Sequence, residues 1–381
     1  MPAPLPGCAH DPGLAKPGRA KPGRAKNDLM PDSRAPSNAE RPGDSEPERI
    51  RLAHGGGGTL MRQLIEQELR PLYADPALAQ HDAARLQLPH GRLAFTTDSY
   101  VVTPLEFAGG DIGTLAVIGT CNDLAMAGAR PLHLSLGLIL EEGLELQRLR
   151  RLLGSLRQAA HDCGVAIVTG DTKVVERGKA DGLYINTSGI GLLETPEPIG
   201  PERIRSGDQL LVSGDLGRHG VAVLAARHGL DLQPPLHSDC APLWPLVEQL
   251  LAAGVRPRCL RDLTRGGLAA ALQELAEAGG HTLALEEERL PVCAAVARCC
   301  DLLGLDPLHL ANEGRCLLVV GPEDLEASLA LLEPQGCWIG EVRPSASGLS
   351  GAAAARVVLQ TPYGSERLLA PQSGELLPRI C

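Results

Sequence analysis

The sequence predicts an α/β protein of two domains, and three observations lead to this prediction. The chain has 381 residues, enough for two domains that each bury a core. Strand patterns and helix patterns follow one another along it, as in α/β proteins. The same scheme begins again, strand first, near Ser206. We expect domains at residues 49–200 and 201–345, with a disordered extension at 1–48 before them and a tail at 346–381 after them.

The extension is rich in Pro, Gly, Ala and charged residues and contains the near-repeat Ala15–Lys26. Such a segment cannot bury enough apolar surface to offset the entropy of ordering it, so we expect disorder. The basic repeat could bind an acidic partner, or it could be a solvated extension without a function.

Composition and charge exclude several classes of function. A net charge of -10 and an aromatic content of 2% argue against a nucleic-acid or anionic-membrane surface. The eleven cysteines include no Cys-x-x-Cys pair, so we expect neither a zinc site nor a disulfide framework. There is no apolar run of about 18 residues and no secretory signal, which predicts a cytoplasmic protein without a membrane span.

A glycine-rich loop opens the first domain and precedes a helix that Thr59 could cap. The loop consists of His54, Gly55, Gly56, Gly57 and Gly58. Free amides before a helix can bind phosphate, although four glycines are also typical of a linker. No Gly-Lys-Ser/Thr follows, so this is not a Walker loop.

The rest of this domain alternates between strands and helices. We expect strands at about 92–102, 132–140, 165–169 and 183–193, and helices at about 112–127, capped by Asp111, and 146–156. The strand at 165–169 would carry Gly170, Asp171, Thr172 and Lys173 at its tip.

The second domain repeats the scheme. Its expected elements are a strand at 206–214, a helix opened by the loop 217–220, a helix at 268–278 after the motif 261–267, a strand at 316–320, a last core strand at 338–342 and an edge strand at 355–360.

Four carboxylates lie near the ends of these elements, at Asp98, Asp123, Asp171 and Asp262. If they meet, they repel one another unless a hard cation joins them, and magnesium both takes oxygen ligands and bridges to nucleotide phosphates. Each alone could instead be a cap or turn residue. Lys173 could offer its charge to a polyphosphate or be a solvated surface lysine.

The sequence ends on Cys381. A thiol at the end of a flexible tail can travel into a pocket, which is the geometry of a carrier. In a chain with eleven cysteines, a terminal one could also arise by chance.

Seven short motifs follow one another between about residue 50 and residue 381. They are His54–Gly58, Thr97–Val101, Gly119–Asp123, Gly170–Val175, Asp262–Gly267, Ala311–Gly314 and Pro378–Cys381. Together they resemble the HypE family of hydrogenase maturation factors. This family belongs to the ATP-binding superfamily of aminoimidazole ribonucleotide synthetase, selenophosphate synthetase and thiamine monophosphate kinase. The terminal cysteine is what points to the HypE family within it.

The resemblance implies N-terminal sheets that pair across a homodimer, with ATP and Mg2+ between the domains. It also implies a reaction, the ATP-dependent dehydration of a carbamoyl group on Cys381 to a thiocyanate. A carbamoyltransferase, HypF, would load the thiol. The cyanide would then pass to iron on a HypC-HypD scaffold, for a nickel-iron hydrogenase.

Site residues follow from the resemblance. Magnesium would be held by Asp98, Asp123, Asp171 and Asp262, and the nucleotide would be bound by Asp98, Asn122, Asp123, Asp171, Thr172, Lys173 and the loop His54 to Gly58. Cys381 would carry the substrate. Glu313 is the preferred general base, because burial in an apolar domain would raise its pKa toward the working range. His54 and His219 are rivals, and either could have only a loop or core role.

Two residues depart from the family pattern. Gly56 stands where a serine is common, which removes one hydroxyl contact to phosphate, and Cys121 stands where an alanine is common. Two other functions also stay open: a small-molecule kinase or synthetase in which Cys381 is incidental, and a partner-docking protein with a vestigial nucleotide site.

Overall fold

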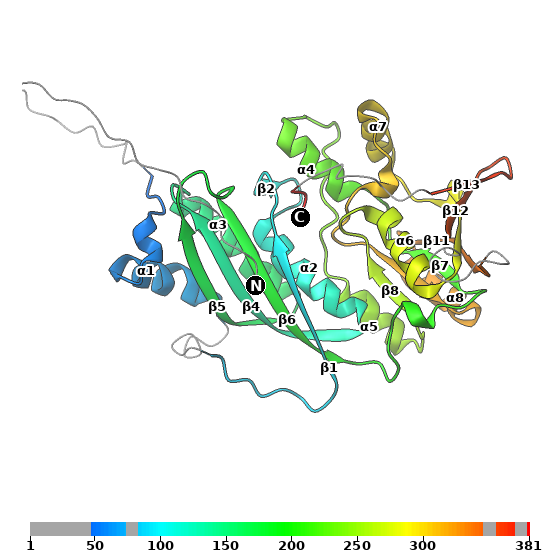
Figure 1. Ribbon diagram of the computed structural model, residues 1–381, viewed down its shortest axis with the longest axis horizontal. Coiled ribbons are helices and arrows are strands. Elements are labelled where there is room, and N and C mark those ends of the chain that lie inside the picture. Colours follow the sequence, from blue (N-terminus) through cyan, green and yellow to red (C-terminus); the bar gives the residue numbers. More distant parts are fainter. Residues whose placement is uncertain (1–46, 74–82, 346–355, 370–378) are drawn as a thin grey trace, which may run out of the picture. The chain divides into compact units, whose positions relative to one another are not determined.

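The computed structural model describes residues 47–73, 83–345, 356–369 and 379–381 (Figure 1). The extension predicted at 1–48, including its basic repeat, lies outside the described residues except for its last two positions.

A four-stranded sheet forms the first domain, with two helices on one of its faces (Figure 1). Its strand order is β1-β6-β4-β5; β4 and β5 are parallel, and the other pairs are antiparallel. The elements are β1 (Leu93–Tyr100), α2 (Ile112–Met126), β4 (Ala129–Glu141), α3 (Leu146–Asp162), β5 (Ala166–Val175) and β6 (Leu183–Leu193). Apolar side chains of both helices and of one face of the sheet form a single hydrophobic cluster. The predicted strands and helices of this domain are present, although β5 extends beyond its predicted end.

Short elements surround this sheet. They are η1 (Leu52–Gly55), α1 (Thr59–Leu64), η2 (Ile65–Leu69), η3 (Arg70–Leu72), β2 (Glu106–Phe107) and β3 (Gly110–Asp111). Asp111 caps α2 as predicted, because its Oδ1 accepts a hydrogen bond from the Thr114 N–H over 2.9 Å. The predicted cap at Thr59 is wrong: Thr59 is the first residue of α1, and Gly58 occupies the cap position.

Strand β5 is longer than predicted. It stays paired with β4 up to Val175, although glycine and aspartate are depleted in strands. The prediction that Asp171 and Lys173 lie at a strand tip is therefore wrong. Both side chains project from the exposed face in the middle of β5, and Thr172 between them is buried.

A seven-stranded sheet forms the second domain, in the order β13-β12-β9-β11-β7-β10-β8. Its elements are β7 (Gln209–Val212), α4 (Arg218–His228), α5 (Trp244–Ala252), β8 (Cys259–Asp262), α6 (Gly267–Gly279), β9 (Thr282–Glu286), α7 (Ala294–Leu303), β10 (Cys316–Val320), α8 (Leu325–Leu332), β11 (Cys337–Arg343), β12 (Arg356–Gln360) and β13 (Glu366–Leu368), with short η5 (Pro201–Arg203), η6 (Glu287–Arg289), η7 (Pro307–His309) and η8 (Pro322–Asp324). Alternate side chains of β7 and β10 belong to two hydrophobic clusters, one with α6 and one with α5 and α8. Both faces of the sheet are therefore covered, and all of β10 is buried.

The end of this sheet corrects two predictions. β12 is not an edge strand, because it pairs in parallel with β9 on one side and antiparallel with β13 on the other. β11 is consequently not the last strand of the core, since Val357 and Leu359 of β12 are buried in it. A domain boundary at residue 345 leaves β12 and β13 outside the sheet that they complete.

Ten cysteines fall within the described residues, and all are free thiols; four of them are buried and none is exposed. Among the helices that the structure describes, none is long and apolar enough to cross a membrane.

Candidate active site around Cys381

The last three residues of the chain are docked beside the segment that follows β1. The Val101 N–H donates to the Cys381 carbonyl over 3.3 Å, and the Thr103 N–H donates to the Arg379 carbonyl over 3.2 Å, as between two strands. Between them, the Ile380 side chain is 4% exposed and belongs to the first hydrophobic cluster. The tail was predicted as flexible throughout, but these three residues have a defined place next to β2 and α4 (Figure 1).

Two arginines fix this docked end. Arg227 of α4 donates from Nε to the Thr103 carbonyl over 2.8 Å and from Nη2 to the Arg379 carbonyl over 2.7 Å. The Arg379 guanidinium pairs with Asp181 over 2.6 Å, and its own φ of 56° is left-handed, which is uncommon outside glycine. The guanidinium of Arg227 thus joins the tail to the strand-like segment that it lies beside.

His219, in the first turn of α4, contacts the tail from the inside. Its Nε2 donates to the Ile380 carbonyl over 2.8 Å, and its Nδ1 accepts from the Ser238 hydroxyl over 2.9 Å. The ring is fully buried, packs edge-to-face on Phe107, and has its pKa lowered by this burial. Both ring nitrogens are therefore occupied, which favours a tail-binding role over the predicted rival role as general base.

Glu313 lies at the end of the docked tail. Its carboxyl group lies beside the Cys381 thiol, and its Oε1 is buried without a hydrogen-bond partner, 4.0 Å from the Nε2 of His219. Burial raises the pKa of Glu313 well above its ordinary value, and the carboxylates of Asp239, Asp262 and Asp98 raise it further. The structure therefore confirms that Glu313 is buried, as expected, but its immediate neighbours include acidic side chains and His219 rather than apolar groups alone.

The thiol of Cys381 is held in its neutral form in this place. Burial and the nearby Glu313 raise its pKa well above the ordinary value, and Arg265 offsets only part of that shift. A docked thiol is consequently a poor nucleophile, because the thiolate is the reactive species.

The side chain of Asn122 is buried and forms hydrogen bonds within the chain, and its predicted nucleotide role stays a prediction. Its side-chain N–H groups donate to the Ala241 carbonyl over 3.1 Å and to the Glu313 carbonyl over 3.2 Å. Its oxygen accepts from the Leu243 N–H over 2.8 Å. The carboxamide is thus used to hold the Glu313 loop in place.

Three of the four predicted metal carboxylates approach one another beside this site. Burial and repulsion from Asp123 raise the pKa of Asp262 to about 7, and Asp98 adds to the shift. Burial also raises the pKa of Asp123, although its Oδ2 accepts a hydrogen bond from the Thr96 hydroxyl over 2.8 Å. Among the residues that the structure describes, no three acidic, histidine or cysteine side chains come close enough to form a ready-made metal site.

The remaining predicted residues lie apart from this group. Asp171 is on the opposite face of the first sheet from Asp98, and its carboxylate pairs with Lys173 over 2.7 Å, which lowers the pKa of Asp171. Thr172 faces the buried side of β5. The structure therefore does not bring all four carboxylates together within one chain.

The predicted glycine loop packs against strand β5. A side chain at Gly55 would lie 3.0 Å from Val174, and Gly57 has a left-handed φ of 75°. The Nδ1 of His54 accepts a hydrogen bond from the Arg51 N–H over 2.9 Å, so this ring caps its own turn. The predicted contacts of the loop, Asp171, Thr172 and Lys173 with phosphate stay predictions.

Sequence reasoning missed four polar residues of the site. Arg227 binds the tail, the charge of Arg265 lowers the pKa of the thiol, and Ser238 and Asp239 contact His219 and the Glu313 loop. Only Arg265 lies in a motif that the sequence singled out. The other three carry no local signal, since their partners are distant in the chain.

Comparison with known proteins identifies the family of this chain. Residues 80–193 match the N-terminal domain of AIR synthase related proteins, and residues 205–350 match their C-terminal domain. The chain is also 47% identical over 342 residues to the carbamoyl dehydratase HypE of Rhodobacter capsulatus, covering 88% of this chain and 98% of that protein. The chain belongs to the HypE family.

Solved structures of HypE proteins resemble the whole described fold. A crystal structure of hydrogenase maturation protein HypE in complex with ATP has a TM-score of 0.82 and 44% identity, covering 87% of this chain and 99% of that one. A crystal structure of a HypE-HypF complex has a TM-score of 0.69 and 40% identity, covering 82% and 99%. The expected two-domain α/β fold and the resemblance to the HypE family are thereby confirmed.

Proposed function

We propose that this HypE family member is an ATP-dependent carbamoyl dehydratase that acts on its own Cys381. Its product would be a protein thiocyanate, the source of cyanide for the iron of a nickel-iron hydrogenase. The observation that carries this proposal is the place of the Cys381 thiol beside the buried Glu313, at the end of a tail held by His219 and Arg227. The identity of the chain to HypE carbamoyl dehydratases supports the reaction type.

The reaction removes an oxygen atom and two protons from the carbamoyl group while the sulfur stays bonded to carbon. The amide oxygen takes the γ-phosphoryl group of ATP and leaves as phosphate, since free oxide is a poor leaving group. The nitrogen must lose its protons as the nitrile forms. Glu313 is positioned to accept a proton, because it lies beside the sulfur that would carry the carbamoyl group and its amide nitrogen.

The surroundings of Glu313 suit this role. Hydrogen bonds from an amide to a carboxylate favour its ionised form. The neighbouring thiol already acts in this direction on the pKa of Glu313, against the larger effect of burial. Burial makes the ionised carboxylate a stronger base than one in water. The same burial excludes water, which would otherwise compete with phosphate chemistry at the site.

The oxygen donors at Asp98, Asp123 and Asp262 fit Mg2+. Their mutual repulsion, seen in the raised pKa of Asp262, is what a hard cation would relieve. Magnesium commonly takes only one or two carboxylates together with substrate phosphates, so these residues need not form a closed cage. When bound, the ion would supply positive charge to the polyphosphate and to the carboxylates around it. Asp171 is not part of this proposed set.

The proposal includes the partners that the resemblance implies. HypF would load Cys381, and the HypC-HypD scaffold would receive the cyanide; the solved HypE-HypF complex supports the first of these. A homodimer through the first sheet is supported by the exposed Phe95, Leu93 and Ile139, of which Phe95 is 70% exposed. The cytoplasmic location stays a prediction.

Intact-mass spectrometry tests the proposal directly. The chain is loaded by HypF with carbamoyl phosphate, and ATP and Mg2+ are then added. We expect the loaded chain to lose the mass of one water, while Cys381→Ala takes no load and Glu313→Gln takes the load but keeps its water. Glu326→Gln, an exposed carboxyl on α8, is the matched control and should behave as the native chain. A loaded native chain that keeps its water under these conditions would refute the proposal.

A further inference from the structure

The segment Ser238–Leu243, which leads from α4 into α5, contacts both groups that face the tail. It has no regular secondary structure, yet Asp239 is buried and Ser238 is half-buried. Two of its side chains and two of its backbone groups form hydrogen bonds with site residues. We call residues 238–243 the positioning segment.

Ser238 determines how the His219 ring is held. Because Nε2 of the ring donates to the Ile380 carbonyl, Nδ1 of the neutral ring can only accept, and it accepts from the Ser238 hydroxyl over 2.9 Å. The Ser238 oxygen in turn accepts from the Cys240 N–H over 3.2 Å. The hydroxyl therefore has one direction available, and the two bonds of the ring set both its tautomer and its orientation.

Asp239 holds the backbone of Glu313. Its side chain is fully buried, and its two oxygens accept from the Glu313 N–H over 3.3 Å and from the Gly314 N–H over 3.2 Å. The carbonyl of Glu313 is bound by Asn122, which also binds the segment at Ala241 and Leu243. The peptide of Glu313 is thus held at both ends.

Two glycines allow the segment to come this close. A side chain at Gly314 would lie 2.0 Å from the Asp239 carbonyl oxygen, and one at Gly109, where φ is 90°, would lie 2.7 Å from the Ser238 nitrogen. Both contacts are to backbone atoms, which cannot rotate away as a side chain can. The segment is therefore packed between two glycine backbones.

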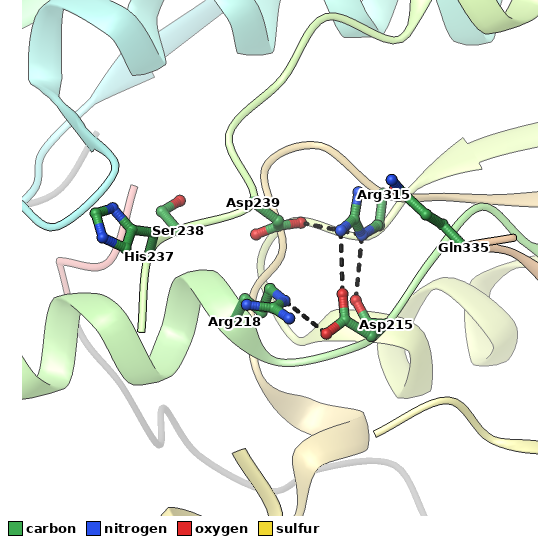
Figure 2. Close-up of a pocket in the computed structure, with 7 residues that line it drawn as sticks. All are labelled: Asp215, Arg218, His237, Ser238, Asp239, Arg315 and Gln335. Atoms are coloured by element: carbon green, nitrogen blue, oxygen red, sulfur yellow. Dashed lines mark hydrogen bonds and ion pairs between the residues drawn. The ribbon is translucent and has the colours of Figure 1, made fainter. Parts of the chain in front are cut away.

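A chain of ion pairs lies behind the segment (Figure 2). Arg315 donates from Nη2 to Asp215 over 3.0 Å, and its Nε lies 3.9 Å from the carboxylate of Asp239. Asp215 also pairs with Arg218 over 2.5 Å. The chain runs from the residue before His219 to a residue two positions after Glu313, and its two acids and two bases compensate one another. These groups line a cavity of about 430 Å³.

We propose that Ser238 and Asp239 are positioning residues for the dehydration, which hold the tail-binding imidazole and the basic carboxyl in one fixed relation. This inference rests on the proposed function, because it assigns to the segment the orientation of groups that act in that reaction. Groups that act together need to be held within a fraction of an ångström, and small displacements lower the rate steeply.

Asp239→Asn is the first test. The carboxamide has one oxygen and turns its NH2 group toward one of two buried N–H donors, so Glu313 loses half of its support. We expect the rate of water loss from the carbamoylated chain, with ATP and Mg2+, to fall tenfold or more. The KM for ATP should stay within twofold, because the segment holds the acceptor side of the site. His237→Gln, at an exposed neighbour in the sequence, should keep the native rate.

Ser238 gives an independent test, in which a threonine variant at the same position is the control. Ser238→Ala removes the hydroxyl that Nδ1 of His219 accepts from, and we expect the rate to fall about fivefold to tenfold. Ser238→Thr retains a hydroxyl and should recover most of the rate. A structural role alone would not separate alanine from threonine in this way.

The outcomes separate this inference from the proposed function. If the native chain does not lose water, the proposed function fails. If the native chain does lose water and Asp239→Asn stays within twofold of it, the role of Asp239 is overturned. Should Asp239→Asn fail to fold, the serine pair decides: equal rates for Ser238→Ala and Ser238→Thr overturn the inference, and a rate lost with alanine and kept with threonine supports it.

Discussion

The Nε2 of His219 donates a hydrogen bond to the backbone carbonyl of Ile380 over 2.8 Å, although 161 residues separate them in the chain. The donor ring is fully buried, and its lowered pKa keeps it neutral. A residue of α4 therefore binds the main chain of the tail one position before the thiol.

Replacing this ring should release the tail. His219→Phe keeps the ring volume but leaves the buried Ile380 carbonyl and the half-buried Ser238 hydroxyl without their partner. We expect iodoacetamide to alkylate Cys381 roughly tenfold faster, which corresponds to a loss of about 1.4 kcal/mol in docking. Mass spectrometry that localises the label to Cys381 measures this rate. His228→Phe, at an exposed position of the same helix, is the control, and an unchanged rate in His219→Phe would contradict the docking role.

Arg227 and Arg379 should contribute unequally to docking. Arg227→Lys cannot span the Thr103 and Arg379 carbonyls with one planar group, so alkylation of Cys381 should be several-fold faster. Asp181→Asn removes the partner of Arg379, but this pair is largely exposed, and such pairs contribute about 0 to 1 kcal/mol. We expect its alkylation rate within about threefold of the native chain. The reverse order of the two variants would show that the ion pair holds the tail.

Glu313→Gln should stabilise the folded chain while it stops the reaction. The groups that face the carboxyl are Asp239, Asp262, Asp98, His219 and Cys381, and burial is the main reason for its raised pKa. Above its ordinary value of 4.5, the folded state therefore binds a proton that the unfolded state has lost. The free energy of unfolding then falls as the pH rises through this range.

Glutamine carries no such proton, so the advantage of Glu313→Gln over the native chain should grow from pH 5 to pH 8. Thermal unfolding at several pH values, without Mg2+ and nucleotide, measures the difference in Tm. Glu326→Gln serves again as the exposed control. A constant difference in Tm over this range would show that Glu313 is ionised in the folded chain.

Gly119 is required by its contact with Tyr100. A side chain at Gly119 would lie 2.3 Å from the Tyr100 hydroxyl, in the buried layer between α2 and β1. We expect Gly119→Ala to lower the free energy of unfolding by about 1 to 3 kcal/mol. Tyr100→Phe in the same chain should restore part of this loss, because it removes the nearest atom. The comparison is urea unfolding of the single and double variants.

The matched glycine is Gly154 in the middle of α3. A side chain there meets nothing within 4 Å, so Gly154→Ala should stabilise the chain by about 0.5 to 1 kcal/mol through its higher helix propensity. Equal effects of both substitutions would mean that the space around Gly119 is not the cause.

The fold was predictable where local pattern and tertiary packing agree. The strand 183–193 has alternating apolar residues, and the structure gives it the same bounds. The predicted strand at 165–169 is shorter than β5, because Gly170 and Asp171 disfavour strand structure locally. Pairing with β4 stabilises the strand at these two residues. Strand β12 was placed at an edge because its parallel partner β9 is 74 residues earlier, a pairing that no local signal reports.

The site residues likewise include some that a local motif predicts and others that depend on distant partners. Glu313 could be found because it stands in a motif beside an apolar strand, and burial does raise its pKa. The resemblance implies a nucleotide role for Asn122, which stays a prediction, and no local signal reports its hydrogen bonds with the distant Ala241, Leu243 and Glu313. Asp239 could not be found, since its role depends on two N–H groups more than seventy residues away.

The bonds that dock the tail have one further consequence. Val101, Thr103, Arg227 and His219 all bind main-chain atoms of residues 379 to 381, whereas the side chain of Glu313 lies beside the sulfur. The carbamoylated tail and the unmodified tail would therefore bind at this docking site with nearly equal affinity. Docking would depend on the backbone conformation of the last three residues and very little on the group that the sulfur carries. Turnover would then depend on how fast the tail leaves and re-enters the docking site, because main-chain contacts discriminate little against a tail without a carbamoyl group.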